Sequence, residues 1–219
     1  RSSDLARKGF HMPFLGLFIA VVCLFTFFRK RSNRSQENVT DRFWKRESIA
    51  NNTRLQDLSG LPYITIPFDK FPIGMYENDL LKNYENTLQT LSGQKIVNFG
   101  TQTNTDLKIT YGTASLPALT EYEQNFTTLC QTLTAYAGQL FELGHTDDAR
   151  TILEYGISIG SDLSQNYLLL AKIYQSSGEN GRIRELLASA EQLDSLMKRS
   201  IVEKLTAMLP EDTANTPVQ

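Results

Sequence analysis

Cysteine and histidine are scarce in this chain of 219 residues, which excludes several kinds of site. Cys23 and Cys130 are far apart and form no CxxC pair, so neither a disulfide framework nor a zinc or redox motif is expected. His11 and His145 have no second histidine or carboxylate at ligand spacing, and no metal site is predicted. Cys130 is expected to be a core residue rather than a nucleophile.

Phosphate-binding and catalytic motifs are also missing. The segment SGQKIVNFG contains glycines beside a short predicted strand, but neither GxGxxG nor GxxxxGK[ST] occurs, so no nucleotide or other cofactor is expected. Asp147 and Asp148 are better explained as first-turn helix residues than as paired acid and base, because both lie on one solvent-facing turn. The sequence therefore predicts a protein that is not an enzyme.

Charge is divided unevenly along the chain. Residues 1–34 have seven basic residues and one acidic residue, a charge of +6, and because the whole chain has −2, the remainder has −8. An acidic body of this kind does not favour nucleic-acid binding.

The longest uncharged run is FLGLFIAVVCLFTFF, residues 14–28, which FHMP lengthens to 19 residues. This length predicts a transmembrane helix over residues 10–28, after a basic flank at 1–9. A cleaved signal peptide is less favoured because no small-x-small cleavage site follows the run. Three cationic residues precede the run and four follow it directly, which favours a single-pass cell-membrane protein with its C-terminal body in the cytoplasm. The basic flank is expected to contact lipid head groups.

Residues 29–59 contain charged and apolar residues and no proline, which predicts a basic stalk helix beside the membrane segment. Residues 60–115 are predicted to form a small α+β or irregular segment. GLPYITIPFDKFPIG is expected to be an extended edge strand or strap because of its three prolines. NDLLKNYENTLQTLSG has helical spacing, KIVNFG resembles a strand, and TNTDLKITYGTAS fits either a strand or a short capped helix.

The C-terminal half repeats at one interval. Gly144 recurs as Gly178, 34 residues later, and apolar or small residues coincide at that offset over roughly residues 130–197. Two helices can approach closely only where a small side chain leaves room, and glycine is the easiest residue in a left-handed turn. The residues expected to carry this packing are Ala137, Leu140, Gly144, Ala149, Ala171, Tyr174, Gly178 and Ala190.

This pattern resembles the tetratricopeptide repeat (TPR), whose period is 34 residues. The resemblance implies a mainly α fold: an array of helical hairpins over residues 116–209 with a C-terminal cap helix, followed by a disordered tail at 210–219. Ile183 stands where alanine is usual, and Ser161 and Ser195 replace the usual closing proline. The layout also resembles uncharacterised bacterial membrane-anchored repeat proteins, which implies no function.

In TPR proteins the first helices of successive repeats line a concave groove that binds a peptide or a helix. By register, the groove residues here are Gln131, Thr134, Gly138, Phe141, Gln165, Leu168, Lys172 and Gln175. The Lys/Asn set that clamps a peptide carboxylate is absent, and Phe141 and Leu168 favour an amphipathic helix as ligand. The resemblance therefore implies a non-catalytic adaptor or scaffold for a protein partner. The alternative is a structural subunit of an envelope complex, a homo-oligomer included, whose groove is filled by residues 40–75 or by another copy.

Overall fold

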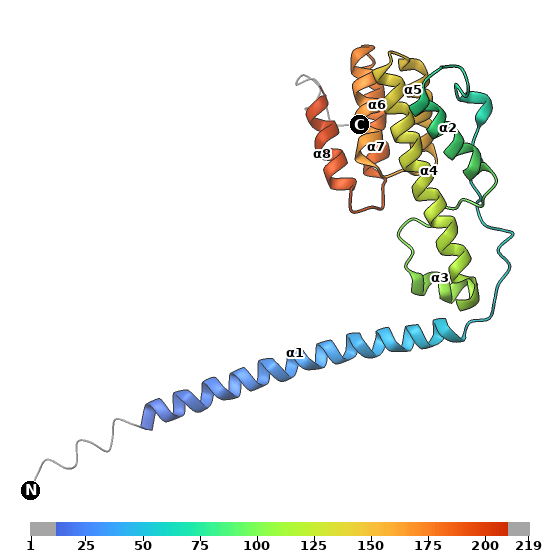
Figure 1. The fold of residues 1–219 in the computed structure, drawn as a ribbon. Coiled ribbons are helices and arrows are strands. Elements are labelled where there is room, and N and C mark those ends of the chain that lie inside the picture. The colour runs from blue at the N-terminus through green and yellow to red at the C-terminus, as the bar shows by residue number, and fades with distance from the viewer. Residues whose placement is uncertain (1–11, 210–219) are drawn as a thin grey trace, which may run out of the picture.

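The computed structural model describes residues 12–209, and within its first helix the side chains of residues 16–28 and 40–52. The fold is mainly helical, as predicted, and no strand occurs among the described residues (Figure 1). A long helix, α1 (Met12–Asn52), extends away from a body of packed helices. The predicted flank at 1–9 and the predicted tail at 210–219 lie outside the described residues.

The predicted transmembrane helix over residues 10–28 is corrected by the structure. Within residues 12–209, no helix combines the length and the apolar composition that crossing a bilayer requires. α1 then continues without a break into the charged sequence beyond Phe28, and the stalk helix predicted for 29–59 is the second part of this one helix.

The predicted α+β segment over residues 60–115 is also wrong, because none of its extended pieces pairs into a ladder. Residues 53–78 form a strap that contains only the short 3₁₀ helix η1 (Phe68–Lys70). The strap and residues 94–99 share one backbone bond, from Ile64 N–H to Ile96 C=O at 2.9 Å, whereas Val97 N–H donates to Tyr122 C=O at 3.3 Å. Pro62, Pro67 and Pro72 have no N–H to donate, which prevents a continuous pairing.

Two helices of the middle segment pack on the repeats and on α1. α2 (Asp79–Ser92) begins at Asn78, whose side chain accepts from two backbone N–H groups, and packs against α4. The ambiguous segment after residue 100 is the helix α3 (Asn104–Tyr111), followed by η2 (Thr113–Ser115). Thr103 and Asp106 form a capping box at the start of α3.

The junction between α1 and α3 is held by polar contacts. The Glu47 carboxylate accepts from Thr105 at 2.9 Å and pairs with Lys108, while Arg46 pairs with Asp106. Backbone groups join as well: Gln56 N–H donates to Tyr111 C=O at 3.1 Å, and the Thr113 hydroxyl donates to Ala50 C=O at 3.1 Å. These contacts involve residues 46–56, so the end of α1 is fixed to α3 and η2.

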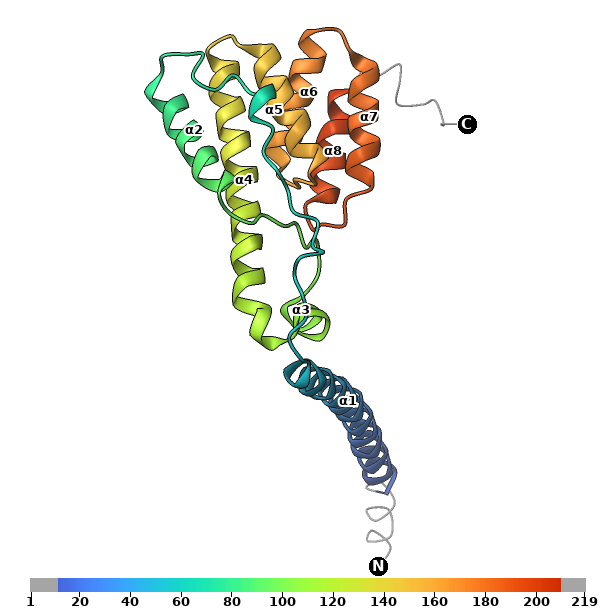
Figure 2. The same cartoon turned by 90° about the vertical axis from the view of Figure 1, so that its right-hand side faces the viewer.

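The C-terminal half consists of two helical hairpins and a further helix, which lie side by side (Figure 2). Their helices are α4 (Leu116–Glu142), α5 (Thr146–Ser158), α6 (Ser164–Ser176), α7 (Asn180–Glu191) and α8 (Lys198–Met208). Gly144 and Gly178 occupy equivalent turns with φ of 86° and 73°, the left-handed region that favours glycine. The helix predicted at the C-terminal end of the array is α8, which packs against both α6 and α7.

Small side chains lie where the helices of each hairpin meet. Ala137, Ala149, Ala171 and Ala190 are fully buried, as are the large neighbours Leu140 and Leu153. One hydrophobic core runs from the strap and α2 through α4 to α8. The predicted packing residues therefore lie inside the body, except for Gly144 and Gly178, which are exposed in the turns.

Enlarging one of these alanines tests the packing. Ala171→Leu is expected to lower the free energy of unfolding by about 1–3 kcal/mol, because the extra methyl groups have no space between α6 and its neighbours. Urea denaturation measures the change. Ala188→Leu, on the exposed side of α7, is the matched control and should be nearly neutral. Equal effects at the two positions would contradict the packing.

Candidate partner-binding groove

An open cavity of about 750 Å³ lies between α4 and α6, and we call it the α4–α6 groove. Its walls come from consecutive first helices of the two hairpins, with Tyr84 of α2 and Lys204 of α8 also lining it. The α4 residues Ala135, Gly138 and Glu142 are spaced by three and four, so they lie on one helix face. The remaining lining residues are on α6: Ser164, Gln165, Leu168, Leu169 and Lys172.

The eight predicted groove residues fall into three groups. Gly138, Gln165, Leu168 and Lys172 line the groove together. Phe141 lies beside it, with the Lys172 Nζ 5.0 Å from its ring centroid. The others lie elsewhere: Thr134 is buried and donates to Cys130 C=O at 2.8 Å, Gln175 donates to Met208 C=O at 3.4 Å, and Gln131 is exposed outside the groove lining.

Gly138 leaves the groove wall open. It lies inside α4, where glycine destabilises a helix by roughly 0.5–1 kcal/mol relative to alanine. A Cβ built on Gly138 would meet no atom within 4 Å, so helix packing does not require a glycine here. The missing side chain instead widens the groove beside Leu168.

The groove combines apolar surface with two lysines and the single carboxylate of Glu142. Leu168, Leu169 and Tyr84 are partly buried and offer apolar contact area. Lys172 and Lys204 are exposed, and no carboxylate pairs with either of them among the described residues. This surface suits a helix with apolar residues on one face and a carboxylate near the lysines.

The strap lies against α5, on the second helix of the first hairpin. Tyr76 stacks on His145 with ring centroids 3.6 Å apart and donates to Asp148 at 2.6 Å. Tyr155 of α5 packs edge-on against Phe71 and donates to Thr65 C=O at 2.8 Å. None of the residues 40–75 lines the α4–α6 groove.

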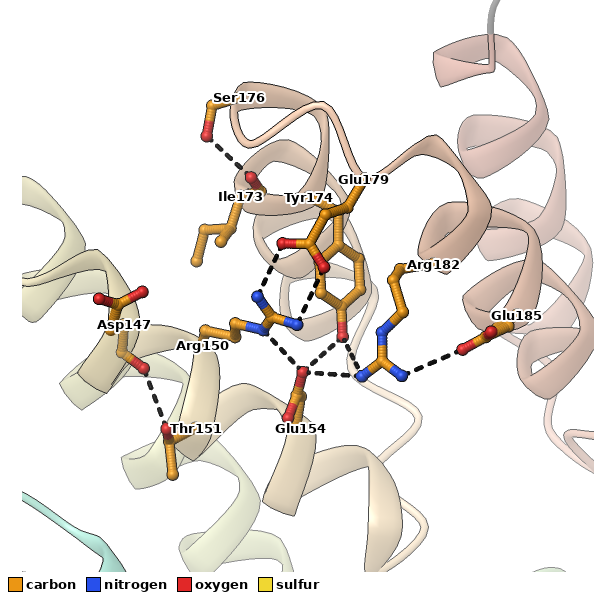
Figure 3. Close-up of polar contacts among 10 residues, drawn as sticks. All are labelled: Asp147, Arg150, Thr151, Glu154, Ile173, Tyr174, Ser176, Glu179, Arg182 and Glu185. Carbon is orange, nitrogen blue, oxygen red and sulfur yellow. Dashed lines mark hydrogen bonds and ion pairs between the residues drawn. The ribbon is translucent and has the colours of Figure 1, made fainter.

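A polar cluster on α5, α6 and α7 joins the two hairpins (Figure 3). Arg150 donates to both carboxylate oxygens of Glu179, at 2.8 and 3.1 Å, and to Glu154 at 2.9 Å. Tyr174 donates to the same Glu154 oxygen at 2.7 Å, and its ring lies 5.0 Å from the Arg150 guanidinium carbon and 5.4 Å from that of Arg182. Arg182 also pairs with Glu154 and Glu185 at 3.1 Å each.

The protonation states of this cluster are explained by its contacts. Burial and the hydrogen bond to Glu154 together raise the pKa of Tyr174 to about 12. Burial alone would raise the pKa of Glu154, but the bonds from Tyr174, Arg150 and Arg182 outweigh it and lower that pKa. Glu154 is thus held ionised between two guanidinium groups, which identifies the cluster as a structural clamp. The i,i+4 spacing of Arg150 and Glu154 indicates an ion pair from the sequence alone. Their partners on α6 and α7 are identified only by the three-dimensional structure.

The residues considered for chemistry have other roles. Cys130 is buried, and burial raises the pKa of its thiol to about 12, so little nucleophilic thiolate forms near neutral pH. Asp148 accepts the Tyr76 hydroxyl, and His145 stacks on the same ring. Over residues 12–209, no group of three or more His, Cys, Asp or Glu side chains could hold a metal ion.

No family model, curated protein or solved structure matches this chain. The likeness to tetratricopeptide repeats therefore stays a prediction from the sequence.

Proposed function

We propose that the protein is a non-catalytic TPR-like adaptor that binds a helical segment of a protein partner in the α4–α6 groove. The supporting observation is the open cavity of about 750 Å³, lined by Gly138, Gln165, Leu168 and Lys172 from two successive hairpins. A partner helix would lay its apolar face on Leu168 and Leu169. An acidic residue of that helix would face Lys172 and Lys204.

The position of the strap is the reason to prefer an adaptor over a structural subunit that fills its own groove. Residues 60–76 contact α5 through Tyr155, Asp148 and His145, and the groove lining contains none of them. The strap therefore does not fill the groove, which supports the binding of another molecule there. The predicted cell-membrane localisation, cytoplasmic body and lipid contact of the basic flank stay predictions.

Gly138 offers a test that separates folding from binding. Gly138→Ala is expected to raise the free energy of unfolding by about 0.5–1 kcal/mol, because the methyl group has free space and strengthens α4. Gly138→Leu should also fold, since its side chain enters the open groove, but should block the partner. Thermal unfolding of both variants measures the first effect.

Binding is then measured by placing a photo-crosslinking residue at Leu168 in the full chain and irradiating living cells. Crosslinks to one partner protein should persist in Gly138→Ala and disappear in Gly138→Leu. A probe at exposed Ser189 of α7, outside the groove, is the matched control and should not give that adduct. Crosslinks only between copies of this chain would support the structural-subunit alternative, and adducts that are unchanged in Gly138→Leu would refute the groove.

A further inference from the structure

A second open cavity, of about 670 Å³, lies where the α5–α6 turn and the α7–α8 loop meet the middle of α4, and we call it the loop cavity. It shares no lining residue with the α4–α6 groove. Two of its apolar lining residues are strongly exposed: Leu196 is 100% exposed and Met197 is 45% exposed. Phe126 of α4 and Leu193 add partly buried apolar surface beside them.

The exposed Leu196 lies in a loop that is held in place on both sides. Thr101 donates to the Asp194 carboxylate at 2.8 Å, and Ser195 donates to the Asp162 carboxylate at 2.5 Å. Met197 N–H donates to the Ser195 hydroxyl at 3.1 Å. Because the residues on both sides of Leu196 are held by hydrogen bonds, the loop is already ordered with Leu196 exposed. Binding of a ligand would therefore cost little conformational entropy of the loop.

The opposite side of the loop cavity is fixed too. Gly160 has φ of 87°, and a Cβ there would lie 2.6 Å from the Asn98 side-chain nitrogen. That nitrogen donates to Ile159 C=O at 3.2 Å, which ties the loop after residue 97 to the α5–α6 turn. The cavity is therefore preformed.

The charged side chains that line the loop cavity are all acidic. Glu123, Asp162 and Asp194 are its charged lining residues, and no lysine or arginine with a described side chain lines it. None of these three carboxylates forms an ion pair within the described part of the chain. An apolar platform beside three carboxylates is complementary to a segment with large apolar residues followed by cations.

The chain itself contains such a segment. Phe27 and Phe28 are exposed on α1, 60% and 63%, and their rings pack edge-on 6.0 Å apart. The sequence that follows them is RKRSNR, with four basic residues and no acidic residue. Within one molecule, α1 extends away from the body (Figure 1), and none of the α1 residues with described side chains lines the loop cavity. A second copy has no such restriction.

We propose that the loop cavity of one copy binds residues 27–34 of a second copy, with the phenylalanines on Leu196 and Met197 and the cations facing Glu123, Asp162 and Asp194. The two contacts are reciprocal if the copies are related by a two-fold axis, which closes the assembly as a dimer. The α4–α6 groove remains open in this arrangement. This inference does not depend on the proposed adaptor function.

The first test measures binding of a fluorescent peptide, FFRKRSNRS, which corresponds to residues 27–35. The receptor is the full chain with Arg29, Lys30 and Arg31 replaced by serine, so that it does not compete with the peptide. Anisotropy should show saturable binding that weakens in high salt. Leu196→Ser should raise the Kd by about tenfold or more, a loss of about 1.4 kcal/mol. Leu143→Ser, an exposed leucine in the α4–α5 turn, is the matched control and should leave the Kd unchanged.

The second test measures self-association of the full chain by sedimentation velocity. The dimer should weaken in Leu196→Ser and in Glu123→Lys, and Lys30→Glu should partly restore it in the Glu123→Lys background. Peptide binding without a dimer would overturn the second copy as occupant. Self-association unchanged in Leu196→Ser would overturn the loop cavity as the dimer contact, and equal peptide binding by the Leu196→Ser and Leu143→Ser receptors would overturn it as the peptide site.

Discussion

Tyr136→Ala is expected to lower the free energy of unfolding by about 3–5 kcal/mol, the largest loss among the substitutions considered. Tyr136 is fully buried in α4, where its ring packs beside Tyr84 of α2 with centroids 6.3 Å apart. Its hydroxyl donates to the Glu85 carboxylate at 3.0 Å and lies 3.3 Å from Pro72 C=O in the strap. Alanine would remove a core ring and the contacts that attach the strap and α2 to the repeats. Chemical denaturation followed by far-UV circular dichroism measures the loss.

Tyr136→Phe separates the ring from its hydroxyl. Phenylalanine keeps the packing but leaves the buried Glu85 carboxylate without its donor, so a smaller loss of about 1–3 kcal/mol is expected. The pair of variants should therefore differ by the contribution of the ring. A phenylalanine variant as unstable as the alanine variant would contradict the packing role of Tyr136.

Gly112→Ala is expected to cost roughly 2–4 kcal/mol, because two separate penalties add at this position. Gly112 has φ of 86° and ψ of 149°, a backbone conformation that residues other than glycine rarely adopt. A Cβ there would also lie 2.6 Å from the Arg54 carbonyl oxygen, which belongs to the chain leaving α1. Backbone oxygen cannot rotate aside, so α3 and the end of α1 would have to separate.

Gly144→Ala provides the matched control for this substitution. Gly144 has the same φ of 86°, but a Cβ there would meet no atom within 4 Å. Its expected cost is about 1–2 kcal/mol, from the left-handed backbone alone. Hydrogen exchange should show faster exchange of the α3 amides in Gly112→Ala only. If the two alanines cost the same, the close approach of Arg54 to Gly112 is not present in solution.

The repeat half was predictable from the sequence because its signals are local and agree with one another. Ala137 and Ala171 recur at one interval with Gly144 and Gly178, and sterics allow few arrangements for small residues between two helices. The middle segment was not predictable in the same way. Alternation at Ile64 and Ile66 is typical of a strand, but pairing depends on a distant partner, and Ile96 provides only one backbone bond.

Only some of the groove residues could be predicted from spacing along the sequence, because others depend on contacts between distant helices. Register places Gly138, Leu168 and Lys172 on the groove side of their helices. Thr134 departs because Asn166 of α6 is buried and lies 3.3 Å from its hydroxyl, which makes this position part of the contact between hairpins. Tyr84 and Lys204 come from helices outside the repeat, and no spacing along the sequence connects them to α4.

The length of α4 has a mechanical consequence. It continues without interruption from Leu116, beside α3, to Glu142 at the groove, and its only proline is Pro117 in the first turn. Interior proline is a common cause of a sharp kink, and α4 has none. Since the end of α1 is fixed to α3, and α3 packs against α4, we expect a displacement of α1 to reach the first turns of α4.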